Sequence, residues 1–232
     1  MHHALTECRR SAAGFYTLFS RLLHREMDEE LWRLLEANAH VLPAFGGEKS
    51  AAPALREMVA RHAAEGKEEA LLTLASLYAK AFLGMREGGG VPLCQSVYTS
   101  PKHLLFQQPI FDARAAYRSE QLELPEGGDM PDDHLAVILA FLSHQAALAA
   151  DLPPEVEEWI PALEKEARFR QKLALSWVKE AATLAETRMP DSFYTLLLRY
   201  LEEFLEYDQM ESDALLADLK ALSPTRTMAA GA

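Results

Sequence analysis

Cysteine is scarce in this chain of 232 residues, which contains only Cys8 and Cys94 and no C-x-x-C pair. This count argues against a disulfide framework and against a cysteine-based zinc site, so we expect two reduced thiols. Long apolar segments are also missing, since no run reaches the roughly 20 residues that a membrane-spanning helix needs. The sequence therefore predicts no stable insertion into a membrane.

The common motifs of nucleotide and metal enzymes are absent as well. There is no G-x-x-x-x-G-K-[ST] phosphate loop and no HExxH, and none of the eight histidines has a glutamate three residues before it. Gly88-Gly89-Gly90 follows a predicted helix rather than a strand, unlike a dinucleotide loop. We expect no catalysis, no metal and no cofactor. The alternative is a helical nucleotide- or haem-binding protein or enzyme, which a stoichiometric cofactor in the purified protein would support.

Positive charge is in short supply, because 23 lysines and arginines face 35 aspartates and glutamates, for a formal net charge of −12. Such a surface repels nucleic acids and anionic lipids, whereas it attracts a basic peptide. The acidic run from Glu202 to Asp213 is interpreted as a solvated helix face, and only weakly as a docking patch.

The first residues imitate an export signal, because Arg9-Arg10-Ser11 precedes an apolar stretch. Arg21, His24 and Arg25 interrupt that stretch, however, and no small-residue cleavage site follows it. Its apolar residues instead have the spacing of an amphipathic helix. We predict no targeting signal and a cytoplasmic protein.

Helical segments follow one another along the chain, and glycine and proline, with 11 and 12 residues, mostly fall between them. No convincing strand or repeat is visible. We predict a single globular all-α domain over residues 1–232 with about ten helices, a linker over 124–131 that could act as a hinge, and a disordered tail over 224–232. The expected helices are about 4–24, 28–40, 53–64, 67–84, 109–117, 132–150, one or two between 154 and 187 with Pro161 as an end, kink or start, 191–207, and a separate 213–222.

Two short segments between helices stand out as candidate sites. In the first, Pro92 restricts the backbone, Ser96 can bond the local backbone, and Tyr98 offers an amphipathic ring. Such groups suit a groove that holds a peptide. The alternative is that Tyr98 is a core residue and Ser96 a turn residue.

The second segment, Pro131-Asp132-Asp133-His134, opens the helix expected at 132–150. Asp132 or Asp133 can cap that helix, and His134 in its first turn should have a lowered pKa. An acidic pair beside a neutral imidazole would accept hydrogen bonds from an arginine or a peptide backbone. The alternative is plain helix capping.

Read together, these segments resemble the paired motifs of the TorD/DmsD/NarJ family of cytoplasmic molybdoenzyme maturation chaperones. Ser96-Val97-Tyr98 with Leu105-Phe106 is similar to the serine-x-aromatic motif, and Pro131-Asp132-Asp133-His134 to the Glu-Pro-x-Asp-His motif. Met130 stands where the family often has glutamate, and Cys94 where an aromatic residue often precedes the serine. The likeness extends to Phe15-Tyr16-Thr17-Leu18-Phe19, the segment 77–84, Trp177 and Phe193-Tyr194.

This resemblance implies an all-helical chaperone of the TorD-like type, without catalysis or cofactor. Its expected partners are the twin-arginine signal peptide and the apo-form of a molybdopterin oxidoreductase, held in the cytoplasm until the cofactor is inserted. The client could be a reductase for dimethyl sulfoxide, trimethylamine oxide, nitrate or another anion. A monomer or a domain-swapped homodimer is expected. The signal-peptide-binding residues would be Pro92, Ser96, Tyr98, Pro131, Asp132, Asp133 and His134.

Overall fold

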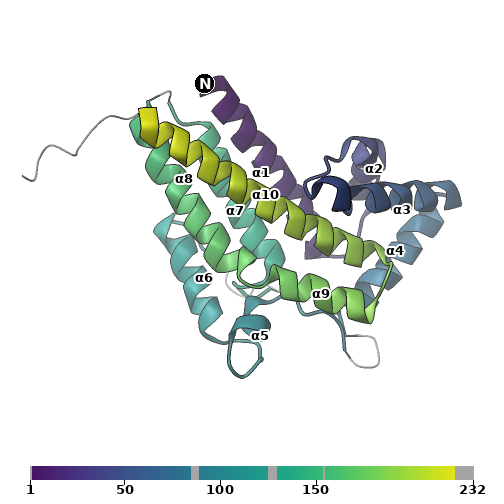
Figure 1. The fold of residues 1–232 in the computed structure, drawn as a ribbon. Helices are drawn as coiled ribbons and strands as arrows, with labels where there is room; N and C mark the ends of the chain where they lie inside the picture. The colour runs from purple at the N-terminus through teal and green to yellow at the C-terminus, as the bar shows by residue number, and fades with distance from the viewer. Residues whose placement is uncertain (1, 85–88, 125–129, 154, 223–232) are drawn as a thin grey trace, which may run out of the picture.

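The computed structural model describes residues 2–84, 89–124, 130–153 and 155–222, and these residues form an all-α structure, as predicted (Figure 1). Most of the expected hinge at 124–131 and the expected tail at 224–232 lie outside the described residues. The described α-helices are α1 (His2–His24), α2 (Glu29–Asn38), α3 (Ala52–Glu65), α4 (Lys67–Phe82), α5 (Gln95–Thr99), α6 (Gln108–Ser119), α7 (Leu135–Ala150), α8 (Val156–Arg170), α9 (Val178–Arg188) and α10 (Phe193–Leu222).

Several helix ends follow directly from local chemistry. The Asp28 carboxylate accepts a hydrogen bond from the Leu31 N–H at 2.8 Å and so caps α2, at the start expected from the sequence. Gly66 ends α3 and starts α4 with φ +98°, a backbone conformation that favours glycine. Pro53 lies in the first turn of α3, where its missing N–H costs nothing.

Two predictions about helices were wrong, and the alternatives at Pro161 are narrowed. Helix α8 continues through Pro161 to Arg170, and a short π-helical turn, Gln171–Leu175, separates it from α9. The segments predicted as two helices at 191–207 and 213–222 form the single 30-residue helix α10. Segment 95–99, expected in a loop, forms the short helix α5.

Helices from both ends of the chain pack into the interior. Helix α1 packs along α7, while α10 crosses α8 and α9 and also reaches α3 and α4 (Figure 1). One large cluster of buried apolar side chains extends from α1 to α10, and within it the Phe19 ring contacts both Tyr200 and Phe204. None of the helices in the described ranges is long and apolar enough to cross a membrane.

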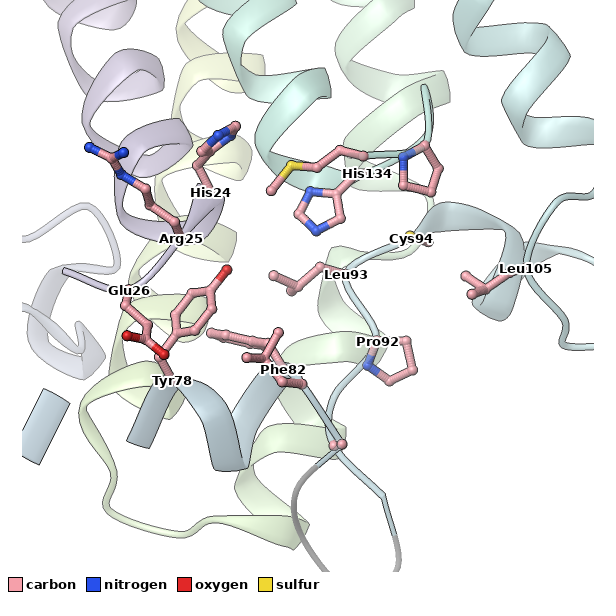
Figure 2. A pocket seen from close by; sticks show the side chains of 15 residues that line it. His24, Arg25, Glu26, Tyr78, Phe82, Pro92, Leu93, Cys94, Leu105 and His134 are labelled. Carbon is pink, nitrogen blue, oxygen red and sulfur yellow. The ribbon is translucent and has the colours of Figure 1, made fainter. Parts of the chain in front are cut away.

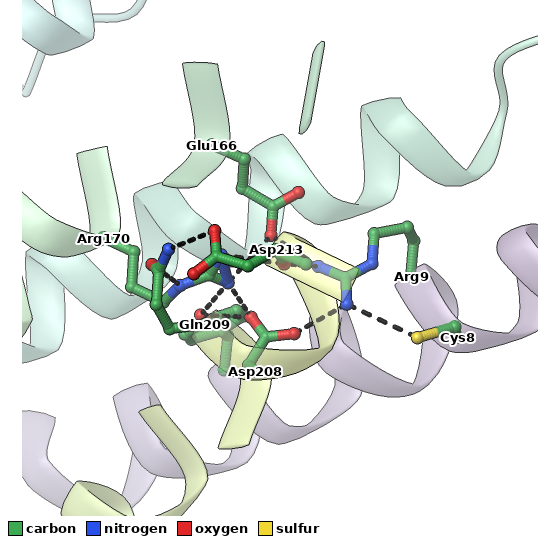
Figure 3. A network of polar contacts seen from close by, with 9 residues as sticks. Cys8, Arg9, Glu166, Arg170, Asp208, Gln209 and Asp213 are labelled. Carbon is green, nitrogen blue, oxygen red and sulfur yellow. Dashed lines mark hydrogen bonds and ion pairs between the residues drawn. The ribbon is translucent and has the colours of Figure 1, made fainter. Parts of the chain in front are cut away.

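A buried network of charges ties α1, α8 and α10 together (Figure 3). The Arg9 guanidinium pairs with Glu166 at 2.9 Å and with Asp208 at 2.6 Å. Asp208 also pairs with Arg170 and accepts the Tyr16 hydroxyl at 2.7 Å. Burial acts to raise the pKa of Asp208, but Arg9 and Arg170 outweigh it and hold the pKa below its usual value.

This network corrects the interpretation of Glu202 to Asp213 as a solvated face. Asp208 and Ser212 are almost completely buried, and Glu202 is also buried. The acidic residues of that run therefore divide between solvent and interior, and Asp208 is a structural residue.

Candidate functional site

The two segments singled out in the sequence meet in the structure through their backbones. Cys94 and His134 form an isolated antiparallel β-bridge. On either side of it, the Leu135 N–H donates to the Leu93 carbonyl at 2.7 Å, and the Gln95 N–H donates to the Asp133 carbonyl at 3.1 Å. We call this contact, formed by residues 93–96 and 133–135, the motif junction.

Buried hydrogen bonds between Ser96 and Asp133 stabilise the motif junction. Both are 0% exposed. One carboxylate oxygen of Asp133 accepts the Ser96 N–H at 2.8 Å and also the Ser96 hydroxyl. The Ser96 oxygen in turn accepts the Gln107 N–H at 3.3 Å. Asp133 thus accepts a backbone N–H from the first turn of α5, a helix distant in sequence, rather than from the first turn of α7.

Asp132 forms its hydrogen bonds with α6 instead. Its carboxylate receives two hydrogen bonds from Arg114, at 3.2 and 2.7 Å, and its carbonyl accepts the Tyr117 hydroxyl at 2.7 Å. The expectation that Asp132 or Asp133 caps the helix after the second motif was therefore wrong. Paired bonds of this kind hold a carboxylate in a fixed geometry.

The cap of α7 is His134, whose Nδ1 accepts the Ala136 N–H at 3.2 Å. Burial lowers the pKa of His134 to about 4, and the nearby His24 adds to the effect. The direction agrees with the expectation from its place at a helix start, but the main cause is burial. The ring is consequently neutral at physiological pH, as its role as a hydrogen-bond acceptor requires.

Tyr98 shapes the first segment. Its hydroxyl donates to the Pro92 carbonyl at 2.8 Å, and its ring stacks on Trp177 with centroids 5.1 Å apart and planes at 23°. Burial raises the pKa of Tyr98 well above its usual value. Gly90 lets this segment return past α4, because a Cβ there would lie 2.4 Å from the Ala81 carbonyl oxygen.

A pocket of about 700 Å³ opens beside the motif junction (Figure 2). Of the seven residues predicted from the sequence, Pro92, Pro131 and His134 line it. The other four, Ser96, Tyr98, Asp132 and Asp133, are not among its lining residues and build the wall behind it. The full lining is His24, Arg25, Glu26, Tyr78, Phe82, Leu83, Gly84, Gly90, Pro92, Leu93, Cys94, Leu105, Met130, Pro131 and His134.

Sequence reasoning missed the opposite side of this junction pocket. His24 is the last residue of α1 and Glu26 lies two residues beyond it, while Tyr78 and Phe82 belong to α4. The periodicity of α4 placed Tyr78 and Phe82 on its apolar face, but no local signal places that face beside His134. Glu26 has no recognisable motif around it at all.

The junction pocket is mostly apolar, with a few polar groups in its lining. Its polar lining residues include Glu26, Arg25, His24 and His134. Because Nδ1 of the neutral His134 ring accepts the Ala136 N–H, the ring proton lies on Nε2, which is a hydrogen-bond donor. Burial, with the charge of Asp133, raises the pKa of the Cys94 thiol to about 12, which makes it a poor nucleophile. Within the described ranges, no group of three or more histidine, cysteine, aspartate and glutamate residues could hold a metal ion.

Comparison with known proteins gives one family and a set of curated relatives. The family model described as "Nitrate reductase delta subunit" matches residues 47–183. The protein named "Chaperone protein TorD" of Ferrimonas balearica is 31% identical over 205 residues, which cover 79% of this chain and 92% of that relative. Proteins of the same name from Aliivibrio salmonicida and Shewanella loihica are 26% and 27% identical, over 84% and 88% of this chain and 92% and 93% of their own lengths. No solved structure matches the chain.

Proposed function

This chain belongs to the nitrate reductase delta subunit family, and we propose that it is a chaperone that binds the twin-arginine signal peptide of a molybdopterin oxidoreductase. It would hold the apo-enzyme in the cytoplasm until the cofactor is inserted. The observation that carries the proposal is the junction pocket, which lies where the two family-like motifs meet. The net charge of −12 favours a basic partner.

The seven predicted residues divide into two roles in this proposal. Pro92, Pro131 and His134 contact the peptide, since their side chains line the pocket. Ser96, Tyr98, Asp132 and Asp133 hold the pocket wall in place through their bonds to neighbouring segments. Substitutions in the first group should weaken peptide binding, whereas substitutions in the second should lower folding stability.

The binding test is titration calorimetry of the purified chain with a synthetic twin-arginine leader of a molybdopterin oxidoreductase from the same organism. We expect a dissociation constant in the micromolar range, about −8 kcal/mol, that weakens as salt screens the charges. A leader with both arginines replaced by glutamine is the control. Equal binding of the two leaders at low salt would refute recognition of the arginines.

The two roles are separated by comparing His134→Ala with Ser96→Ala. His134→Ala should weaken leader binding by roughly 1–2 kcal/mol, as expected for loss of an interface contact. Ser96→Ala should lower the free energy of unfolding, because it removes a buried hydrogen bond to a carboxylate. A larger loss of affinity per folded molecule in Ser96→Ala than in His134→Ala would reverse the assignment.

No catalytic step is part of this proposal. Its support is that the relatives are named as chaperones. Elemental analysis that finds about one metal per chain, retained through chelator treatment, would contradict it. Light scattering of the free chain and of its complex with the leader distinguishes a monomer from the expected alternative, a domain-swapped homodimer.

A further inference from the structure

The junction pocket has different chemistry at its two ends. Figure 2 shows Glu26 beside Tyr78 at one end and Leu105 at the other, with Phe82 and Leu93 between them. Leu105 is 44% exposed. One end therefore carries the single carboxylate of the lining, beside Arg25, whereas the other presents apolar surface to solvent.

Glu26 is the single carboxylate among the residues that line the pocket. It is exposed, and within the described ranges no lysine, arginine or histidine lies within ion-pair distance of it. The neighbouring Arg25 does not compensate its charge, because the Arg25 guanidinium pairs with Asp28 at 2.8 Å. Arg25 is itself a lining residue of the pocket, and in Figure 2 its guanidinium extends to the side opposite Leu93.

The charge of Glu26 is felt inside the pocket. Burial raises the pKa of Tyr78 to about 12, and the negative charge of Glu26 contributes to that rise. Glu26 acts in the same direction on Tyr194, which contacts Tyr78 with ring centroids 5.5 Å apart. Phe82 packs against both tyrosines with centroids 5.1 Å away. Of these three rings, Tyr78 and Phe82 line the pocket with Glu26, and Tyr194 is buried behind them.

A carboxylate beside aromatic rings is well suited to a guanidinium group. A carboxylate can accept two parallel hydrogen bonds from arginine, while an aromatic face attracts the planar cation. The acidic pair suggested by the sequence is not available for this purpose. Asp132 already pairs with Arg114, and Asp133 is fully buried against Ser96.

We infer that Glu26 receives the arginines of the leader, and that Leu105 receives the apolar segment that follows them. The peptide then lies along the junction pocket in one direction, with its basic end at α1 and its apolar end at the loop after α5. Export leaders carry their basic residues before their apolar residues, which matches the two ends of the pocket. This inference rests on the proposed function.

The test is a double-mutant cycle between Glu26→Gln and the leader in which glutamine replaces both arginines. We expect Glu26→Gln to weaken binding of the natural leader about tenfold, a loss of about 1.4 kcal/mol, and to leave binding of the glutamine leader within about twofold. Glu36→Gln is the matched control, because it removes an equal charge from an exposed position outside the pocket and should change neither affinity by more than about twofold. Glu26 is exposed, so loss of folding does not confound the cycle.

The apolar end is tested with Leu105→Ser. This variant should weaken binding of the natural and glutamine leaders by the same factor, because its contact is with a segment that both share. Equal weakening of both leaders by Glu26→Gln, or no weakening of either, would overturn the assignment of Glu26. Failure of the natural leader to bind the unaltered chain would instead refute the proposed function itself, and this inference with it.

Discussion

Replacement of His134 by asparagine should remove a large part of the pH dependence of folding stability. The His134 ring is mostly buried, and its pKa falls from 6.5 to about 4 on folding. Between these values the unfolded chain binds a proton at His134 and the folded chain does not. Stability therefore decreases as the pH falls from about 7 toward 4, since the unfolded state binds more protons.

The magnitude follows from the two pKa values. At about 1.4 kcal/mol for each tenfold difference in proton affinity, the full effect of the ring is about 3 kcal/mol, reached near pH 4. Between pH 7.5 and pH 5, the range in which most carboxylates stay ionised, the same linkage gives a loss of about 2 kcal/mol. Asparagine does not titrate, and its side-chain oxygen can accept the Ala136 N–H that His134 Nδ1 accepts.

The assay is urea denaturation of the unaltered chain and of His134→Asn at both pH values. The free energy of unfolding of the unaltered chain should fall by about 2 kcal/mol more than that of the variant. His40→Asn is the control, because His40 is exposed and should behave like the unaltered chain. Parallel losses in the unaltered chain and in His134→Asn would refute the view that the fold holds His134 buried and neutral.

Two further predictions concern Asp208 and the two cysteines. Asp208→Asn should lower the free energy of unfolding by roughly 3–5 kcal/mol, because it leaves the buried Arg9 and Arg170 without their shared carboxylate. Chemical denaturation measures this loss, and a change below about 1 kcal/mol would contradict the prediction. Labelling with a thiol reagent at pH 8 should modify the partly exposed Cys8 first and Cys94 only after unfolding, because burial raises the pKa of Cys94 to about 12. Two thiols that react equally fast in the folded protein would contradict this ordering.

The sequence alone was sufficient for the fold class and most helices. Apolar spacing in the first helix, the Asp28 cap and the stop at Gly66 are local signals, because each depends on residues within a turn or two. The break predicted between the last two helices was wrong for a related reason. Asp208 and Ser212 continue the buried face of α10 with polar side chains, so the apolar pattern lapses although the helix does not.

The candidate site was located from the sequence more accurately than its residues could be assigned roles. The two motifs do meet, and Pro92, Pro131 and His134 do line a pocket. A local reading made Asp132 or Asp133 the cap of the helix that follows. The fold instead directs Asp132 to Arg114 and Asp133 to Ser96, and leaves the cap to His134. Hydrogen bonds between distant segments decided these partners, and no local pattern encodes them.

Tertiary packing alone decided what faces the motifs. Glu26 lies just beyond the end of α1 and Tyr78 lies in α4, and only the packing of these segments places them across the pocket from His134. Sequence determined the elements, because helix formation depends on spacing, capping and breakers within one segment. Only the tertiary structure decided the pocket, because its charge and its apolar end come from separate segments that packing brings together.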